Sequence, residues 1–172
     1  LWLTIRSHKR VWLSQVEGLG FTISELYKKY PNMGIIFDGM KTERKTMEKI
    51  KSLIPKSIKT YDGLGCSVEE TVVWSHAMDL AVGPVGAGTI FISLPNKPAV
   101  LHGPKQLCRA NPFCLNPREN CVLITTIDPK DVTDDNDANI SLRNSIVGRN
   151  YDFDWKKLYN KNIAVMENIE NS

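Results

Sequence analysis

The sequence predicts an α/β fold: a three-layer α/β/α Rossmann-like domain with a mostly parallel sheet. Short apolar runs alternate with amphipathic stretches about five times, which is typical of a parallel sheet covered by helices on both faces. The run Gly34–Gly39 is continuously apolar as far as Phe37, as expected for a strand buried on both faces. The length of 172 residues suits one domain, so we expect a single Rossmann-like domain over residues 1–172.

Six segments are short and apolar, and Gly, Pro or Asp residues bound most of them, which favours strands. In chain order, the expected strands are residues 1–5, 34–39, 57–61, 79–84, 99–102 and 121–126.

Five segments have helical character. Apolar residues recur on one face of the stretch from Phe21 to Tyr30, Thr42 and Ser67 are suited to cap helices, and acidic residues follow Ser67 in the first turn, where the helix dipole favours them. The expected helices are residues 21–30, 42–53, 67–78, 89–94 and 151–167, and we expect residues 104–120 and 128–139 to be irregular.

The composition excludes several classes of protein. No apolar run approaches the roughly 18 residues that a membrane span needs, so we expect no spanning helix. A net charge of +3 is too small and too scattered to indicate nucleic acid as a partner. The four cysteines form no CxxC pair, and we interpret them as free thiols in a reducing compartment such as the cytoplasm, with a disulfide or a metal site as alternatives. They are Cys66, Cys108, Cys114 and Cys121.

The clearest functional signal is the glycine-containing loop Val82–Thr89, which joins an expected buried strand to a helix. Glycine lets the backbone approach a ligand closely, and the amides at a helix start favour an anion such as phosphate. The loop lacks the Gly-Lys-Ser/Thr ending of a P-loop, and no third glycine completes a GxGxxG motif. A phosphate cradle is therefore one interpretation, and a tight turn formed by Gly86 and Gly88 is the other.

The order of elements from Asp79 to Lys105 adds context: a strand, a glycine turn, a short helix, Leu94–Pro98 and a second strand. This stretch resembles the carboxyl-terminal, donor-binding half of GT-B glycosyltransferases, in which a buried strand ends in a Gly-rich turn, a helix follows, and a proline precedes the next strand. The resemblance implies that a nucleotide-sugar diphosphate lies against the helix start. The residues it assigns to donor binding there are Gly86, Ala87, Gly88 and Thr89.

A basic loop, Arg6–Arg10, directly follows the first expected strand and holds four side chains that can be cationic. Such a cluster can offset the charge of a diphosphate, and arginine can hold phosphate oxygens with two parallel hydrogen bonds. In GT-B enzymes an arginine or lysine at this place commonly stabilises the departing nucleotide, and the resemblance extends this role to Arg6 and Arg10. A solvated basic turn is the alternative.

Three further strand ends carry candidate donor-binding residues. Asp38 is placed to accept a hydrogen bond from a ribose or sugar hydroxyl, although Asp-Gly is also an ordinary turn former. By positional analogy with GT-B enzymes, Gly63 and the residues up to Cys66 lie near the nucleobase. His102 follows a strand and is a candidate contact to the donor sugar or its phosphate, with a structural histidine as the alternative.

Together these features predict the donor domain of a glycosyltransferase, which moves a sugar from a nucleotide-sugar to an acceptor hydroxyl on a glycan or protein, as in polysaccharide biosynthesis. We expect Arg6, Arg10 and His102 to carry catalysis without a metal or other cofactor. The resemblance also implies an amino-terminal domain that holds the acceptor and often the base. A GT-B-like sugar-nucleotide epimerase and a non-catalytic nucleotide-binding module are the alternatives.

Overall fold

The computed structural model describes residues 1–86, 88, 90–110, 124–135 and 149–171. Its main sheet is parallel in every pairing and has six strands in the order β3-β2-β1-β4-β5-β6, so the predicted three-layer Rossmann-like α/β/α fold is confirmed. The strands are β1 (Trp2–Thr4), β2 (Gly34–Gly39), β3 (Lys59–Leu64), β4 (Ala81–Pro84), β5 (Ala99–His102) and β6 (Ile124–Thr126).

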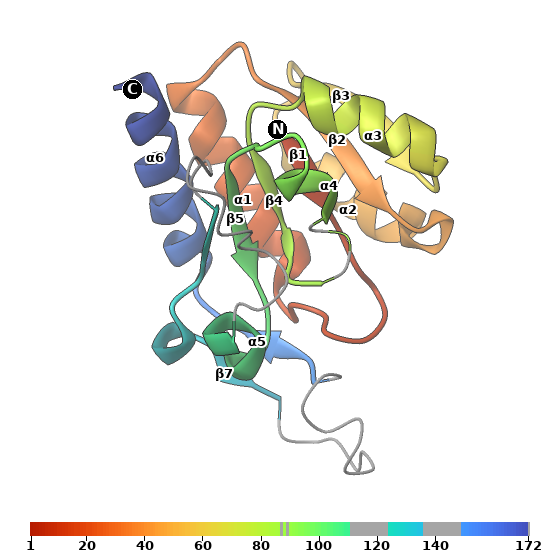
Figure 1. Ribbon diagram of the computed structural model, residues 1–172. Coiled ribbons are helices and arrows are strands. Elements are labelled where there is room, and N and C mark those ends of the chain that lie inside the picture. The colour runs from red at the N-terminus through yellow and green to blue at the C-terminus, as the bar shows by residue number, and fades with distance from the viewer. Residues whose placement is uncertain (87, 89, 111–123, 136–148, 172) are drawn as a thin grey trace.

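Helices cover both faces of this sheet (Figure 1). On one face α1 contacts both α2 and α6, and α6 also contacts β5; on the other, α3 contacts α4. The helices are α1 (Gln15–Lys29), α2 (Arg44–Leu53), α3 (Val68–Ala77), α4 (Ile90–Ser93), α5 (Lys105–Ala110) and α6 (Trp155–Glu170), with a short 3-10 turn, η1 (Lys41–Glu43), directly before α2.

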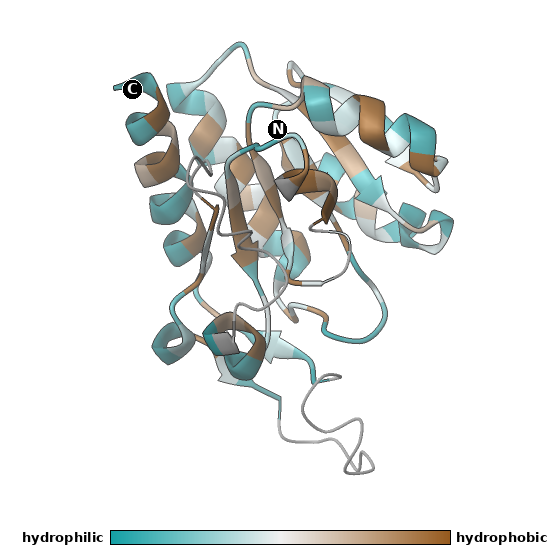
Figure 2. Cartoon of the chain, viewed as in Figure 1, coloured by the Kyte–Doolittle hydropathy of each residue, from teal (hydrophilic) through white to brown (hydrophobic). Residues whose placement is uncertain are grey.

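Because side chains alternate in direction along each strand, the apolar core is divided between the two faces of the sheet. Leu3 and Val82 belong to the larger apolar cluster, which packs under α1, α2 and α6. Their chain neighbours Trp2 and Ala81 belong to the smaller cluster, which packs under α3 and α4. Successive strand residues point to opposite faces, so each strand supplies both layers, and the central strands are accordingly hydrophobic in Figure 2.

The first helix begins earlier than predicted. It starts at Gln15 rather than Phe21, and it contains Gly18 and Gly20, which weaken a helix pattern in sequence. A Cβ at Gly18 would lie 2.2 Å from the Trp12 ring, and one at Gly20 would lie 2.8 Å from Leu53 Cβ. The glycines are therefore needed for close packing, which the local sequence does not reveal.

Residues 104–120 were expected to be irregular, and this is wrong for the first part. Helix α5 begins at Lys105, directly after Pro104, and the Lys105 amide donates a hydrogen bond to Asp134 Oδ1 at 2.9 Å. This side-chain partner comes from a distant segment, so it is not visible in the local pattern. Residues 111–123, which include Cys114, Cys121 and the start of the predicted last strand, lie outside the described residues.

The acidic stretch after residue 128 also has structure that was not expected. It holds a 3-10 turn, η3 (Pro129–Asp131), and a strand, β7 (Thr133–Asp134), that pairs antiparallel with β8 (Tyr151–Asp152). The predicted helix 151–167 correspondingly begins later, at Trp155, where the Asp154 side chain caps it by accepting from the Lys156 amide. No helix among the described residues is long and apolar enough to cross a membrane.

Candidate functional site

The candidate site lies where β1 and β4 are neighbours in the sheet. From this point the chain continues to β2 on one side and to β5 on the other, so the order reverses here. In open α/β sheets, such a switch point at the carboxyl ends of the strands is the usual ligand crevice. The loop after β1 carries Arg6 and Arg10, and the loop after β4 carries Gly86.

Both arginines converge on Gly86 from across the switch point. A Cβ added to Gly86 would lie 2.9 Å from Arg6 Nη2 and 3.7 Å from Arg10 Nη1 and Nη2. Two guanidinium groups therefore lie within 4 Å of one point beside the glycine. A side chain at position 86 would therefore have to displace the Arg6 guanidinium from this point.

No close ion pair within the described part of the chain neutralises the positive charge at this point. None of the ion pairs among the described residues involves Arg6 or Arg10. Burial, and next the charge of Arg10, lower the pKa of Arg6, while Glu43 and Asp38 act in the opposite direction. Two partly desolvated cations held together favour an anion between them.

The backbone of the basic loop is fixed by residues that the sequence analysis did not single out. The Gln15 amide group bridges to Arg6: its Nε2 donates to Arg6 O at 2.5 Å, and its Oε1 accepts from Arg6 N at 3.3 Å. Gln15 is buried, so this pair of bonds is shielded from water. Arg10 has a positive φ of 61° and its Nη1 donates to Val85 O at 3.4 Å, which ties the loop to β4. Only the tertiary packing of α1 places Gln15 here.

His102 lies in the core rather than on the open edge of the sheet, because only 3% of it is exposed. Its Nδ1 lies 2.6 Å from the Tyr151 hydroxyl, and its ring packs against Trp12 and Phe153. Burial, and to a lesser extent the charge of Arg6, lower the pKa of His102 to about 3. The imidazole is therefore neutral at neutral pH, and its burial in the core agrees with the alternative of a structural histidine.

Asp38 and Gly63 lie opposite each other on β2 and β3. Asp38 Oδ2 accepts a hydrogen bond from the Thr4 hydroxyl at 2.9 Å, which links β2 to β1. A Cβ at Gly63 would lie 2.8 Å from the backbone oxygen of Phe37, so the glycine is required by the close approach of the strands. This packing accounts for Gly63 without a nucleobase; its place near a base stays a prediction.

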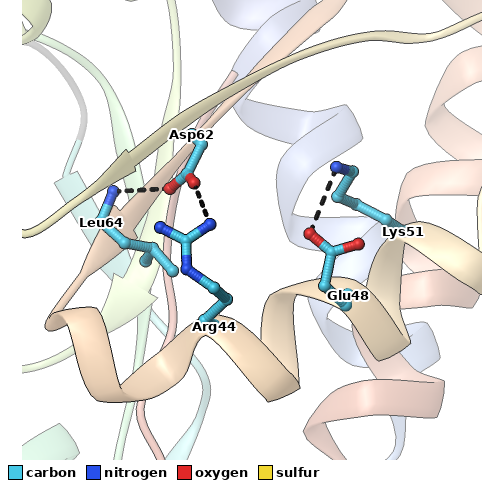
Figure 3. Close-up of polar contacts among 5 residues, drawn as sticks. All are labelled: Arg44, Glu48, Lys51, Asp62 and Leu64. Carbon is cyan, nitrogen blue, oxygen red and sulfur yellow. Dashed lines mark hydrogen bonds and ion pairs between the residues drawn. The ribbon is translucent and has the colours of Figure 1, made fainter.

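Asp62, the residue before Gly63, has a structural role at the end of β3 (Figure 3). Its Oδ1 accepts from the Leu64 amide at 3.1 Å, and its Oδ2 lies 2.5 Å from Arg44 Nη1 on α2. Partial burial alone raises the pKa of Asp62, but the Leu64 amide and the Arg44 guanidinium outweigh it and lower the pKa overall. The pair fastens α2 to the sheet edge.

Of the other residues predicted to bind the donor in the loop after β4, the structure describes only Gly88. Gly88 is exposed, and a Cβ there would meet nothing within 4 Å, so packing does not require this glycine. Ala87 and Thr89 lie outside the described residues. The structure adds Glu43, a buried carboxylate near Arg6 that the sequence analysis missed. Its only sequence signal was an acidic residue shortly after the predicted strand that ends at Gly39.

Across the described part of the chain, no group of three or more His, Cys, Asp or Glu side chains is arranged to hold a metal ion. Cys66 is a free thiol, and Cys108 Sγ donates a hydrogen bond to Gly103 O at 3.2 Å. No protein-family model, curated protein or solved structure matches this chain.

Proposed function

We propose that this domain binds the diphosphate of a nucleotide-sugar and serves as the donor-binding domain of a GT-B-like glycosyltransferase. The observation that carries the proposal is the convergence of Arg6 and Arg10 within 4 Å of one point beside Gly86, without a close carboxylate partner in the described residues. An anion with oxygens on two phosphorus atoms can engage both guanidinium groups, each with parallel hydrogen bonds.

Arg6 and Arg10 are positioned to stabilise the departing nucleoside diphosphate as well as to bind the intact donor. In glycosyl transfer, the bond between the anomeric carbon and the phosphate oxygen breaks, and negative charge develops on the nucleoside diphosphate as it leaves. The acceptor oxygen forms the new bond to that carbon, and its proton passes to a base. Gln15 fixes the backbone of Arg6, and the Val85 carbonyl accepts a hydrogen bond from the Arg10 guanidinium, so both arginines would stabilise the developing charge with little reorganisation of the loop.

Glycosyl transfer rather than another nucleotide reaction is supported by the resemblance of Asp79–Lys105 to GT-B donor domains. The neutral His102 supplies no further positive charge, so in this proposal it supports Arg6 from the core. The acceptor site and the base belong, as the resemblance implies, to an amino-terminal domain. The proposal therefore predicts donor binding by this domain and transfer only when that domain is also present.

The test is calorimetric titration of the protein with UDP, GDP, ADP, CDP and inorganic pyrophosphate. Arg6→Ala is expected to weaken binding of pyrophosphate and of the preferred nucleotide by about tenfold or more, since a hydrogen bond to a charged group is lost. Lys28→Ala is the matched charge control, because Lys28 lies in the last turn of α1, at the opposite end of that helix from Gln15.

A glycine pair refines the test. Gly86→Ala places a methyl group 2.9 Å from Arg6 Nη2 and should displace that flexible guanidinium. Gly34→Ala, at the opposite end of the sheet, adds only an ordinary contact of 3.4 Å with Lys59 O and should leave affinity unchanged. Binding of none of the five ligands by the wild type, or equal affinity in Arg6→Ala and Lys28→Ala, would contradict the proposal. Release of nucleotide from a nucleotide-sugar only on addition of an acceptor, measured with the amino-terminal domain present, would separate transfer from epimerisation.

A further inference from the structure

The helix α3 has apolar residues on the side that faces solvent. Val68, Val72 and Val73 are exposed, and Val73 most of all, at 67%. A helix at the surface of a sheet normally carries polar residues on its outer face, whereas a helix that is apolar on all sides is normally covered. The outer face of α3 is therefore typical of an interface with another protein surface.

The short helix α4 extends this apolar surface. It lies on the same face of the sheet as α3 and contacts it, and it is mostly hydrophobic in Figure 2. Phe91 and Ile92 pack into the core beneath the two helices, whereas Ile90 and Leu94 are exposed. Exposed apolar residues on two neighbouring helices form a patch of the kind that binds protein. This α3–α4 patch consists of Val68, Val72, Val73, Ile90 and Leu94.

The outermost stripe of α3 has a symmetric arrangement of side chains. Glu69, Val73 and His76 follow one another at intervals of four and three residues, so they lie on one face of the helix. The midpoint between Glu69 and His76 falls between Val72 and Val73. A two-fold axis through this midpoint therefore places Glu69 opposite His76 of an antiparallel second copy of the helix, and Val72 opposite Val73.

Glu69 and His76 are available for such a contact. Both are exposed, and neither takes part in an ion pair within the described residues. The pKa of Glu69 is lowered, first by its own amide and then by the Ser67 side chain, so the carboxylate is ionised at neutral pH. An imidazole N–H can donate a hydrogen bond to a carboxylate whether or not the ring is charged.

We propose that the α3–α4 patch is the interface through which two copies of this chain form a symmetric dimer, with their α3 helices antiparallel. In this arrangement two Glu69–His76 pairs flank a centre of valines, as an isologous contact requires. The positive end of each helix dipole also lies beside the negative end of the other. Because helices of ten and four residues cover less than a standard interface of about 1,600 Å², we expect a weak dimer with a micromolar dissociation constant.

Sedimentation equilibrium measures this association. The average mass of the wild type should rise from 19.4 kDa toward twice that value as the protein concentration increases from about 1 µM to about 500 µM. Val73→Arg brings two positive charges together at the centre of the interface and should raise the dissociation constant by about tenfold or more. Leu13→Arg is the matched control, because Leu13 is also exposed but lies outside the patch, and it should associate as the wild type does.

A charge exchange tests the antiparallel pairing. Glu69→Lys and His76→Glu should each weaken the dimer by about fivefold, because each removes the pair at two symmetric positions. The double variant should regain wild-type affinity. Within one copy Glu69 and His76 are about two helical turns apart and cannot contact each other, so the rescue can come only from a contact between copies.

The outcomes decide for or against this dimer. A wild type that stays monomeric throughout the concentration range would overturn the proposal and leave the patch to a different protein. Undiminished association of Val73→Arg, or a double variant that does not regain affinity, would likewise overturn it. Circular dichroism reports on folding, and if Val73→Arg does not fold, the charge exchange alone decides, because both of its positions are exposed.

Discussion

Individual side chains at the carboxyl edge of the sheet set the charge of the candidate site. Arg6 and Arg10 supply positive charge beside Gly86, and the buried imidazole of His102 is neutral. The Tyr151 hydroxyl, 2.6 Å from His102 Nδ1, is also neutral, because burial raises its pKa well above the ordinary value. The polar pair therefore gives the core a hydrogen bond without adding to the charge of the site.

The depressed pKa of His102 predicts how stability depends on pH. The folded protein holds His102 at a pKa of about 3, below the value of 6.5 of an unperturbed histidine, so between these values the unfolded chain binds more protons. This contribution to stability is complete above pH 6.5 and is lost as the pH falls, by up to about 1.4 kcal/mol per pH unit. In His102→Gln this part of the acid destabilisation should be absent.

Urea denaturation from pH 4 to pH 8 measures the effect. The free energy of unfolding of the wild type, relative to His102→Gln, should be constant above pH 7 and fall below pH 6.5. His76→Gln, in the exposed part of α3, should follow the wild type. Parallel curves for the wild type and His102→Gln would contradict a buried, neutral imidazole.

Among the elements, α3 is the helix whose start the local sequence determines most directly. Ser67 Oγ accepts from the Glu70 amide at 3.2 Å, and the Glu70 carboxylate accepts from the Ser67 amide at 2.9 Å, which completes a capping box. The rest of α3 gains little from burial, since Val68, Val72 and Val73 are exposed. The cap therefore carries a large share of what holds this helix in place.

Removing this cap should destabilise the protein measurably. Ser67→Ala is expected to lower the free energy of unfolding by about 1 kcal/mol, because an amide of the first turn loses its acceptor. Ser52→Ala is the control: Ser52 is exposed within α2, and its loss should change stability by less than about 0.5 kcal/mol. Equal effects of the two substitutions in urea denaturation would show that the cap does not stabilise α3.

At the scale of the whole molecule, Trp12 joins the segment after β1 to the segment around β8, which lies far along the chain. Its ring stacks on Phe153 with centroids 4.2 Å apart, and its Nε1 donates to Asp152 Oδ1 at 2.8 Å. Ser14 Oγ donates to the other oxygen of Asp152 at 2.8 Å. The segment around β8 therefore clamps the end of the basic loop, and α6, which follows it, packs beside α1.

Trp12→Ala tests this connection. Trp12 is 1% exposed, and truncating a buried aromatic residue costs about 3–5 kcal/mol, a large part of the stability of an ordinary domain. Leu13→Ala, at a neighbouring side chain that is 54% exposed, should change stability by about 0.5 kcal/mol or less. A loss below about 1 kcal/mol for Trp12→Ala in urea denaturation would refute the clamp.

The sequence by itself determined the layered parallel sheet, because alternating apolar runs and capped amphipathic stretches are local patterns. Strands such as 34–39 and 99–102, and the cap at Ser67, were predictable for this reason. The sequence also predicted that arginines and glycines follow the ends of strands. The tertiary structure alone decided that the arginines meet at Gly86, that His102 is buried, and that Glu43 lies beside Arg6. These features depend on strand order and on contacts between distant segments, which local periodicity does not encode.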